Sequence, residues 1–181
     1  MKLLRKITIF ALIALLVSSF TGCGFILGDA EYYSAHWGSE KRGREKAEQL
    51  ITYINNKDSA GIKSMFSPKN RRNNKDLNSK INEVLAVFPD ELSEYEISPL
   101  VGGQCETESW SVKTNEESVD IFIPKMGANT SDADKYIVIE YTHINHYHED
   151  QVGVNLIRYC DWTDKNNEKE IVIGSRWDSN K

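Results

Sequence analysis

The most strand-like part of the chain reads KYIVIEYTH and spans residues 135–143. In an extended strand, Ile137, Ile139 and Tyr141 fall on one face because side chains alternate with a period of two. Val138 gives the opposite face an apolar group as well. Apolar groups on both faces are typical of a strand in the middle of a sheet, so the sequence predicts a central strand here.

The same two-residue period recurs on both sides of this stretch. Val119, Ile121 and Ile123 alternate with Asp120 and Phe122, for example. Six segments with alternating or β-branched residues are expected to be strands: 94–101, 105–113, 118–124, 135–143, 152–160 and 170–175. Turn residues separate them, with a turn at Gly102-Gly103, a tight turn at Asn115-Glu116 and a polar loop over 127–134. The sequence predicts an antiparallel meander of about six strands.

Helical periodicity fills the chain before these strands. Ala47, Leu50, Ile51 and Ile54 follow the spacing i, i+3, i+4, i+7, which predicts an amphipathic helix over residues 44–56. A second, short helix is expected to begin after a cap at Asp58 and to end near Pro68. A third stripe recurs over residues 77–88 and stops at Pro89, while the Asn- and Arg-rich residues 69–76 are typical of a solvated loop.

Three helices followed by an antiparallel sheet define an α+β domain in which the helices pack on one face of a curved sheet. We expect residues 41–181 to form this single domain and residues 23–40 to form a tether before it. A chain of this length suits one hydrophobic core.

The first 22 residues have the features of an export signal. Lys2, Arg5 and Lys6 precede an apolar run over residues 7–17 that is too short to span a bilayer comfortably. The segment ends at Cys23 after small residues. We therefore expect residues 1–22 to be removed and the protein to act outside the cytosol.

The cleavage region Phe20-Thr21-Gly22-Cys23 resembles a bacterial lipobox. Phe20 departs from the branched apolar residue usual at that position, whereas Gly22 and Cys23 keep the two positions nearest the cut. The resemblance implies a diacylglyceryl thioether on Cys23, a lipid anchor on the outer face of the cell membrane. Ordinary secretion with a free Cys23 thiol is the alternative.

Cleavage would also make the protein more acidic. The 22 basic residues become 19 and the 27 acidic residues remain, so the net charge changes from −5 to −8. A surface of this charge disfavours phosphate backbones, so nucleic acid is not an expected partner. No motif indicates a cofactor.

Two segments near the start of the domain resemble known families: EKAEQLI over residues 45–51 and NNKDSAGIKSMFS over residues 55–67. With the helices-then-strands order, the chain resembles the nuclear-transport-factor-two-like (NTF2-like) superfamily, which has a cystatin-like cone of helices and curved sheet. It also resembles uncharacterised Firmicutes lipoproteins grouped as domain of unknown function family 5104. The resemblance implies a fold and a location, and no catalytic residues carry over from it.

Four residues interrupt otherwise apolar strand patterns and are candidates to line a cavity at the open end of such a cone: Trp110, Tyr141, His143 and Arg158. Ligand sites are typically concave and mostly apolar with a few polar groups. Core packing is the alternative for Trp110 and Tyr141, and solvent exposure for Arg158. An enzyme would use His143 as a base, with Tyr141 or Glu140 nearby.

Two cysteines follow Cys23, and both fall in predicted strands. Outside the cytosol, Cys105 and Cys160 are able to form a disulfide, and packing as separate small apolar residues is the alternative.

The richest polar cluster covers residues 143–150. In a strand, His146 and His148 would share a face and could bind a metal with Asp150, but no further ligands have the spacing of a metal motif. A solvated hairpin tip is the simpler interpretation, and no metal site is predicted.

No catalytic motif names a reaction, so we expect a membrane-anchored module that binds a small molecule or a protein in the cell envelope. The alternatives are a small acid-base enzyme of the isomerase or dehydratase type and an immunity- or inhibitor-like partner of an exported protein.

Overall fold

The computed structural model describes residues 34–35, 37–99, 102–108, 111–124, 133–164 and 166–176. Within these residues, four helices precede the sheet: α3 (Ser39–Asn55), α4 (Ser59–Met65), α5 (Pro68–Asn73) and α6 (Leu77–Val87). The strands follow as β1 (Glu96–Ile97), β2 (Gly102–Glu108), β3 (Ser111–Ile123), β4 (Lys135–Asn145), β5 (Gly153–Asp161) and β6 (Lys169–Gly174), with the short 3₁₀ turn η2 (Glu149–Gln151) before β5. This order confirms the α+β class and the six antiparallel strands.

The first 33 residues lie outside the described part of the chain, so the predicted signal, Cys23 and most of the predicted tether are not placed. Among the described residues, no helix has the length and apolar character needed to cross a membrane.

The three predicted helices are present as α3, α4 and α6. The predicted cap is also confirmed, because the Gly61 amide donates a hydrogen bond to Asp58 Oδ1 over 2.7 Å. α3 begins at Ser39, five residues earlier than its apolar stripe indicated.

The prediction of a loop over residues 69–76 was wrong for its first half, which forms α5. Pro68 is the first residue of this helix, a position that suits its fixed φ angle and missing amide hydrogen. The Ser67 hydroxyl accepts a hydrogen bond from the Asn70 amide and caps the helix. Pro68 thus both ends the preceding helical segment and starts α5.

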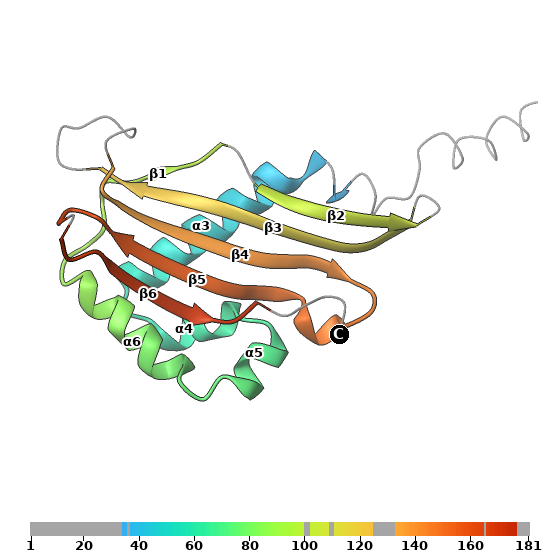
Figure 1. The fold of residues 1–181 in the computed structure, drawn as a ribbon, viewed down its shortest axis with the longest axis horizontal. Helices are drawn as coiled ribbons and strands as arrows, with labels where there is room; N and C mark the ends of the chain where they lie inside the picture. Colours follow the sequence, from blue (N-terminus) through green and yellow to red (C-terminus); the bar gives the residue numbers. More distant parts are fainter. Residues whose placement is uncertain are drawn as a thin grey trace, which may run out of the picture.

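Figure 1 shows a long, twisted sheet whose strands run along the molecule, with α3 behind it and α4, α5 and α6 below it. The strand order is β1-β3-β4-β5-β6, and β2 also pairs with β3, so β4 is central as predicted. β1 pairs with the end of β3, and β2 pairs with its beginning. Both strands therefore have β3 as their neighbour.

Two predicted turns were wrong because strand pairing overrides local composition. Gly102 and Gly103 lie inside β2, paired with Ser118 and Glu117. Asn115 lies inside β3, where the predicted tight turn is instead a bulge in the pairing with β4. β2 and β3 pair antiparallel, with Glu108 opposite Ser111.

The core lies between the helices and one face of the sheet. The sheet contributes residues that lie opposite one another on neighbouring strands. For example, Ile139 pairs with Val119 on one side and with Ile157 on the other. The fully buried members from the sheet are Val119, Ile121, Ile137, Ile139, Val154, Ile157, Tyr159, Ile171 and Ile173, and those from the helices include Ala47, Leu50, Ile54, Ile62, Leu77 and Ile81. We call this part of the sheet face the apolar end.

Candidate functional site

The helix-facing side of the sheet changes from apolar to polar along its strands. On β3, the inward residues run from Ile121 and Val119 to Glu117, and Glu117 pairs with Tyr141 on β4. Polar side chains that are buried gather in this region, which we call the polar end: Thr114, Asn115, Glu117, Tyr141, Thr142, Asn145, Gln151 and Asn155. Burying so many polar groups costs free energy unless each one finds a partner.

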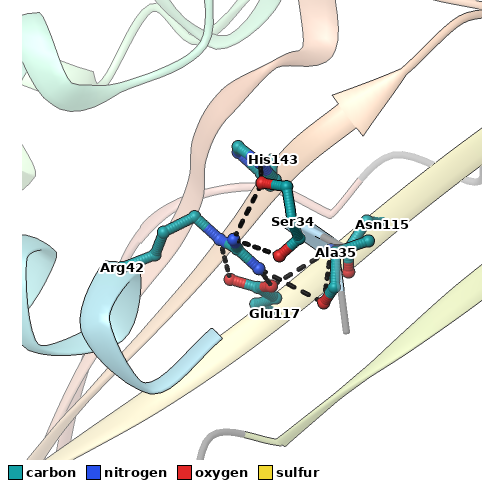
Figure 2. A network of polar contacts seen from close by, with 6 residues as sticks. All are labelled: Ser34, Ala35, Arg42, Asn115, Glu117 and His143. Carbon is teal, nitrogen blue, oxygen red and sulfur yellow. Dashed lines mark hydrogen bonds and ion pairs between the residues drawn. The ribbon is translucent and has the colours of Figure 1, made fainter. Parts of the chain in front are cut away.

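A buried ion pair joins α3 to the polar end (Figure 2). The Arg42 guanidinium donates to both carboxylate oxygens of Glu117, through Nε to Oε2 at 3.1 Å and through Nη2 to Oε1. Asn115 Nδ2 donates to Oε1 as well, at 3.1 Å. The side chains are 15% exposed for Arg42 and 3% for Glu117, so water does little to screen this pair.

These contacts decide the charge of Glu117. Burial by itself would raise the pKa of its carboxyl, but the hydrogen bonds from Arg42, the nearby Tyr141 hydroxyl, the charge of Arg42 and the hydrogen bond from Asn115 together hold that pKa below its ordinary value. Glu117 is therefore an anion at neutral pH, and the pair is charged in the folded protein.

The other edge of the guanidinium holds the chain that enters the domain. Arg42 Nη1 donates to the carbonyl oxygen of Ser34 at 2.5 Å, and Nη2 donates to that of Ala35 at 3.3 Å. Ser34 Oγ lies 3.3 Å from His143 Nε2. Ala35 is buried with Val112 and Ile144 in a small apolar cluster. We call Ser34 and Ala35 the entry segment.

A pocket of about 290 Å³ opens beside this ion pair. One wall comes from α3, where Arg42, Glu45, Lys46 and Gln49 recur at helical spacing and so share a face. The opposite wall consists of Tyr141, Thr142, His143, Val152 and Gly153, from β4 and the start of β5. The lining includes both charges, although most of the surface that faces the pocket is apolar.

The Tyr141 hydroxyl is the unusual group in this pocket. Tyr141 is 2% exposed, and its hydroxyl lies close enough to the Glu117 carboxylate for each group to shift the pKa of the other, yet among the described residues it meets no group with hydrogen-bonding geometry. Burial raises its pKa far above the ordinary tyrosine value, and the nearby Glu117 carboxylate adds to this effect, so the hydroxyl stays neutral and able to donate. Gln151 Nε2 and Asn155 Oδ1 at the same end are buried without partners too.

The structure brings together two of the four residues predicted to line a pocket, Tyr141 and His143. Arg158 does not lie there, because residues 157 and 159 face the core and alternation sends Arg158 to the opposite face, where it pairs with Glu170 at 3.2 Å. Trp110 lies outside the described residues. The pocket that holds Tyr141 and His143 lies at the polar end, beside the Arg42–Glu117 pair.

Glu140, named as a neighbour of a His143 base, also points away from the pocket. It precedes the inward-facing Tyr141, and its carboxylate pairs with Arg176. The hypothesis of a Glu140 contribution is therefore wrong.

The two described cysteines do not form a disulfide. Cys105 is an exposed free thiol on β2 and Cys160 a buried free thiol on β5. The strand order puts β3 and β4 between them, so the interpretation of Cys160 as a small packed side chain fits the structure.

The histidine-rich stretch forms the tip between β4 and η2. Asn145 Oδ1 accepts hydrogen bonds from the amides of Tyr147 and His148, which makes this a tight turn. Asp150 pairs with Arg72 of α5. Within the described part of the chain, no three His, Cys, Asp or Glu side chains gather as metal ligands.

Sequence reasoning missed Arg42, Asn115 and Glu117. Glu117 carried a signal, because it continues the inward alternation of Val119 and Ile121, but the turn predicted at residues 115–116 obscured it. Arg42 lay before the predicted start of its helix, and nothing in the sequence joined it to a residue 75 positions later.

The fold and the site thus define a small α+β protein with an open pocket at the polar end of its sheet. The family model of a domain of unknown function, DUF5104, matches residues 49–162, and the chain belongs to this family. The match includes Glu117, Tyr141 and His143 but begins after Arg42 and the entry segment. A comparison with functionally curated proteins gives no match.

Proposed function

We propose that the protein is a binding module whose pocket at the polar end takes a small ligand with a polar group. The observation that carries this proposal is Tyr141, which lines the pocket and whose buried hydroxyl, beside the Glu117 carboxylate, meets no described group with hydrogen-bonding geometry. An unpaired buried hydroxyl costs about 1–3 kcal/mol, and a ligand that accepts its hydrogen bond would remove this cost.

The size and lining of the pocket limit the ligand. A volume of about 290 Å³ is close to the lower limit of the roughly 300–1,000 Å³ usual for ligand sites, so the ligand is small. Lys46, Gln49 and His143 offer hydrogen bonds, while most of the surface that faces the pocket is apolar. A small ligand with a polar group on an apolar body fits this lining.

The proposed location is the outer face of the cell membrane, with Cys23 lipidated. The export signal and the lipobox-like Gly22-Cys23 support it. Cys23 precedes the entry segment by 11 residues, which span at most about 40 Å when fully extended. Because the entry segment contacts the pocket residues Arg42 and His143, the pocket would stay near the bilayer.

We further propose the NTF2-like cone as the fold. The long twisted antiparallel sheet and the α3 helix packed along it support this assignment. The pocket then corresponds to the open end that such a cone provides.

The ligand proposal is tested by a thermal-shift screen of small metabolites and envelope fragments against the wild type, followed by equilibrium titration of each hit. We expect Tyr141→Phe to weaken binding at least tenfold, because it removes the unpaired donor and little else. Arg158→Ala is the matched control, since Arg158 lies on the opposite face, and it should bind like the wild type. Hits that bind equally to Tyr141→Phe would contradict the proposal.

An acid-base enzyme is the second candidate, and one observation favours it: His143 and the neutral Tyr141 line the same pocket. Such a pair can supply a base and a hydrogen-bond donor. Each ligand from the screen is therefore assayed for turnover. Product formed by the wild type and lost in His143→Ala would replace the binding module with an enzyme.

Lipidation is tested by labelled palmitate incorporation and detergent partitioning of wild type and Cys23→Ala. Labelled wild type in the detergent phase supports the anchor. Unlabelled wild type released into the medium would refute it.

A further inference from the structure

We infer that the entry segment is an internal stand-in for a carboxylate ligand, held on Arg42 until such a ligand displaces it. This inference rests on the proposed function of the pocket and names both its ligand class and a device that regulates it.

The geometry of Arg42 is the starting point. One edge of the guanidinium, formed by Nε and Nη2, is occupied by the Glu117 carboxylate. The outer edge, formed by Nη1 and Nη2, faces two carbonyl oxygens, one from Ser34 and one from Ala35. Two oxygens on the two terminal nitrogens of one guanidinium reproduce the pattern of a bidentate carboxylate (Figure 2).

The two interactions differ in strength. Glu117 is buried, charged and held by Asn115 as well as Arg42. The entry segment supplies neutral carbonyls, and charge-assisted hydrogen bonds are roughly twice as strong as neutral ones. A free carboxylate would therefore make stronger bonds to the outer edge than the carbonyls do, whereas it could not replace Glu117 without leaving that carboxylate unpaired.

The position of the entry segment couples it to the pocket. Arg42 lines the pocket and holds both carbonyls, and His143 lines it and lies 3.3 Å from Ser34 Oγ. Lys46 adds a second cation on the same wall. A carboxylate at the outer edge of Arg42 would thus lie within reach of Lys46 and His143, which makes a small carboxylate the ligand class that these donors recognise.

Ala35 holds the entry segment in place. It is 6% exposed and packs with Val112 and Ile144, and its carbonyl also accepts a hydrogen bond from Asn115 Nδ2 at 3.4 Å. A charge at this position is incompatible with the apolar cluster, so it should release the segment. Before the change, only the fraction of molecules in which the entry segment has left Arg42 can bind a carboxylate. Releasing the segment in all molecules therefore raises the apparent affinity for the carboxylate by the inverse of that fraction.

The test uses the full chain purified in detergent, with acetate, N-acetylglycine and glycylglycine as carboxylate probes and N-acetylglycinamide as their neutral counterpart. Two variants, Ala35→Asp and Ala35→Arg, place opposite charges in the cluster, so an effect common to both comes from release and not from charge. Trp37→Ser is the matched control, because Trp37 lies two residues further on and is 79% exposed. Faster exchange of the Gly38 amide, which donates to the Ser34 carbonyl at 3.1 Å, reports release independently of any ligand.

We expect carboxylates to bind both Ala35 variants about tenfold more tightly than the wild type, with Trp37→Ser unchanged and the neutral probe inactive throughout. Equal carboxylate affinity in the wild type and both released variants would overturn the inference while leaving the binding module intact. Equal binding of the neutral probe would overturn the carboxylate assignment. If no carboxylate binds but the metabolite screen yields a ligand whose binding depends on Tyr141, only this inference fails. If neither experiment yields a ligand, the proposed function is refuted as well.

Discussion

The two ends of the sheet share antiparallel pairing, which is bulged at the polar end, but their side-chain chemistry is opposite. At the apolar end, Ile139 is flanked by Val119 and Ile157, and every one of these side chains is at most 1% exposed. At the polar end, the adjacent inward positions carry Glu117 and Tyr141, and a pocket opens beside them. Close packing of apolar groups stabilises a fold, whereas buried polar groups with missing partners weaken it and often mark function. We conclude that one end provides stability and the other a binding site.

The largest predicted effect is at the apolar end. Ile139→Ala should lower the free energy of unfolding by about 3–4 kcal/mol, because it removes buried methyl groups and leaves a cavity in close-packed surroundings. Urea denaturation measures it, with Val172→Ala on the open face as the control, where a loss below about 1 kcal/mol is expected. A loss at Ile139 no larger than that at Val172 would show that the apolar end is not the stabilising core.

The second prediction concerns the ion pair at the polar end. Arg42→Met should cost about 3 kcal/mol, because it leaves the Glu117 carboxylate buried without its main partner. The double variant Arg42→Met with Glu117→Leu should recover much of that loss, because no buried charge remains. A double-mutant cycle measured by urea denaturation separates the pair from its surroundings. Additive losses in the two single variants would mean that the two side chains act independently.

The third prediction follows from the lowered pKa of Glu117. A carboxyl whose folded pKa lies below its unfolded value, about 4.3 for glutamate, contributes stability above that unfolded value and loses it as pH falls through the folded pKa. The stability advantage of the wild type over Glu117→Gln should thus be constant near neutral pH and shrink below about pH 4.3. Denaturation midpoints from pH 7 to pH 3 measure it. An advantage that grows on acidification would give the opposite sign and refute the assignment of a charged Glu117.

The apolar end was predictable from the sequence and the polar end was not. Val119 and Ile121 on one strand, and Ile137 and Ile139 on the next, repeat with a clear period of two, and the inward stripe of α3 repeats with a clear helical period, since burial of one face imposes both patterns. Burial leaves no such pattern in polar residues. Asn115 and Glu117 have the composition of a turn, and only pairing with β2 and β4, which is decided by the whole sheet, holds them in a strand.

The site residues also divide into those that the sequence reveals and those that it does not. Tyr141 and His143 were found because they interrupt an apolar alternation, whereas Arg158 interrupts one too but faces the other side of the sheet. The contact of Arg42 with Ser34 and Glu117 depends on where α3 crosses the sheet, and local sequence does not specify that crossing.

Two tyrosines on the same face of the sheet give the most direct test of the contrast between the ends. The Tyr159 hydroxyl donates to Asp161 Oδ2 at 3.2 Å, whereas the Tyr141 hydroxyl has no hydrogen-bond partner among the described residues. Each is changed to phenylalanine and the free energy of unfolding without ligand is measured in urea. We predict that Tyr159→Phe loses about 1 kcal/mol, the usual net value of a hydrogen bond, and that Tyr141→Phe is unchanged or gains stability. A loss in Tyr141→Phe equal to or greater than that in Tyr159→Phe would show that the Tyr141 hydroxyl already has a stabilising partner and would contradict its role as a donor kept for a ligand.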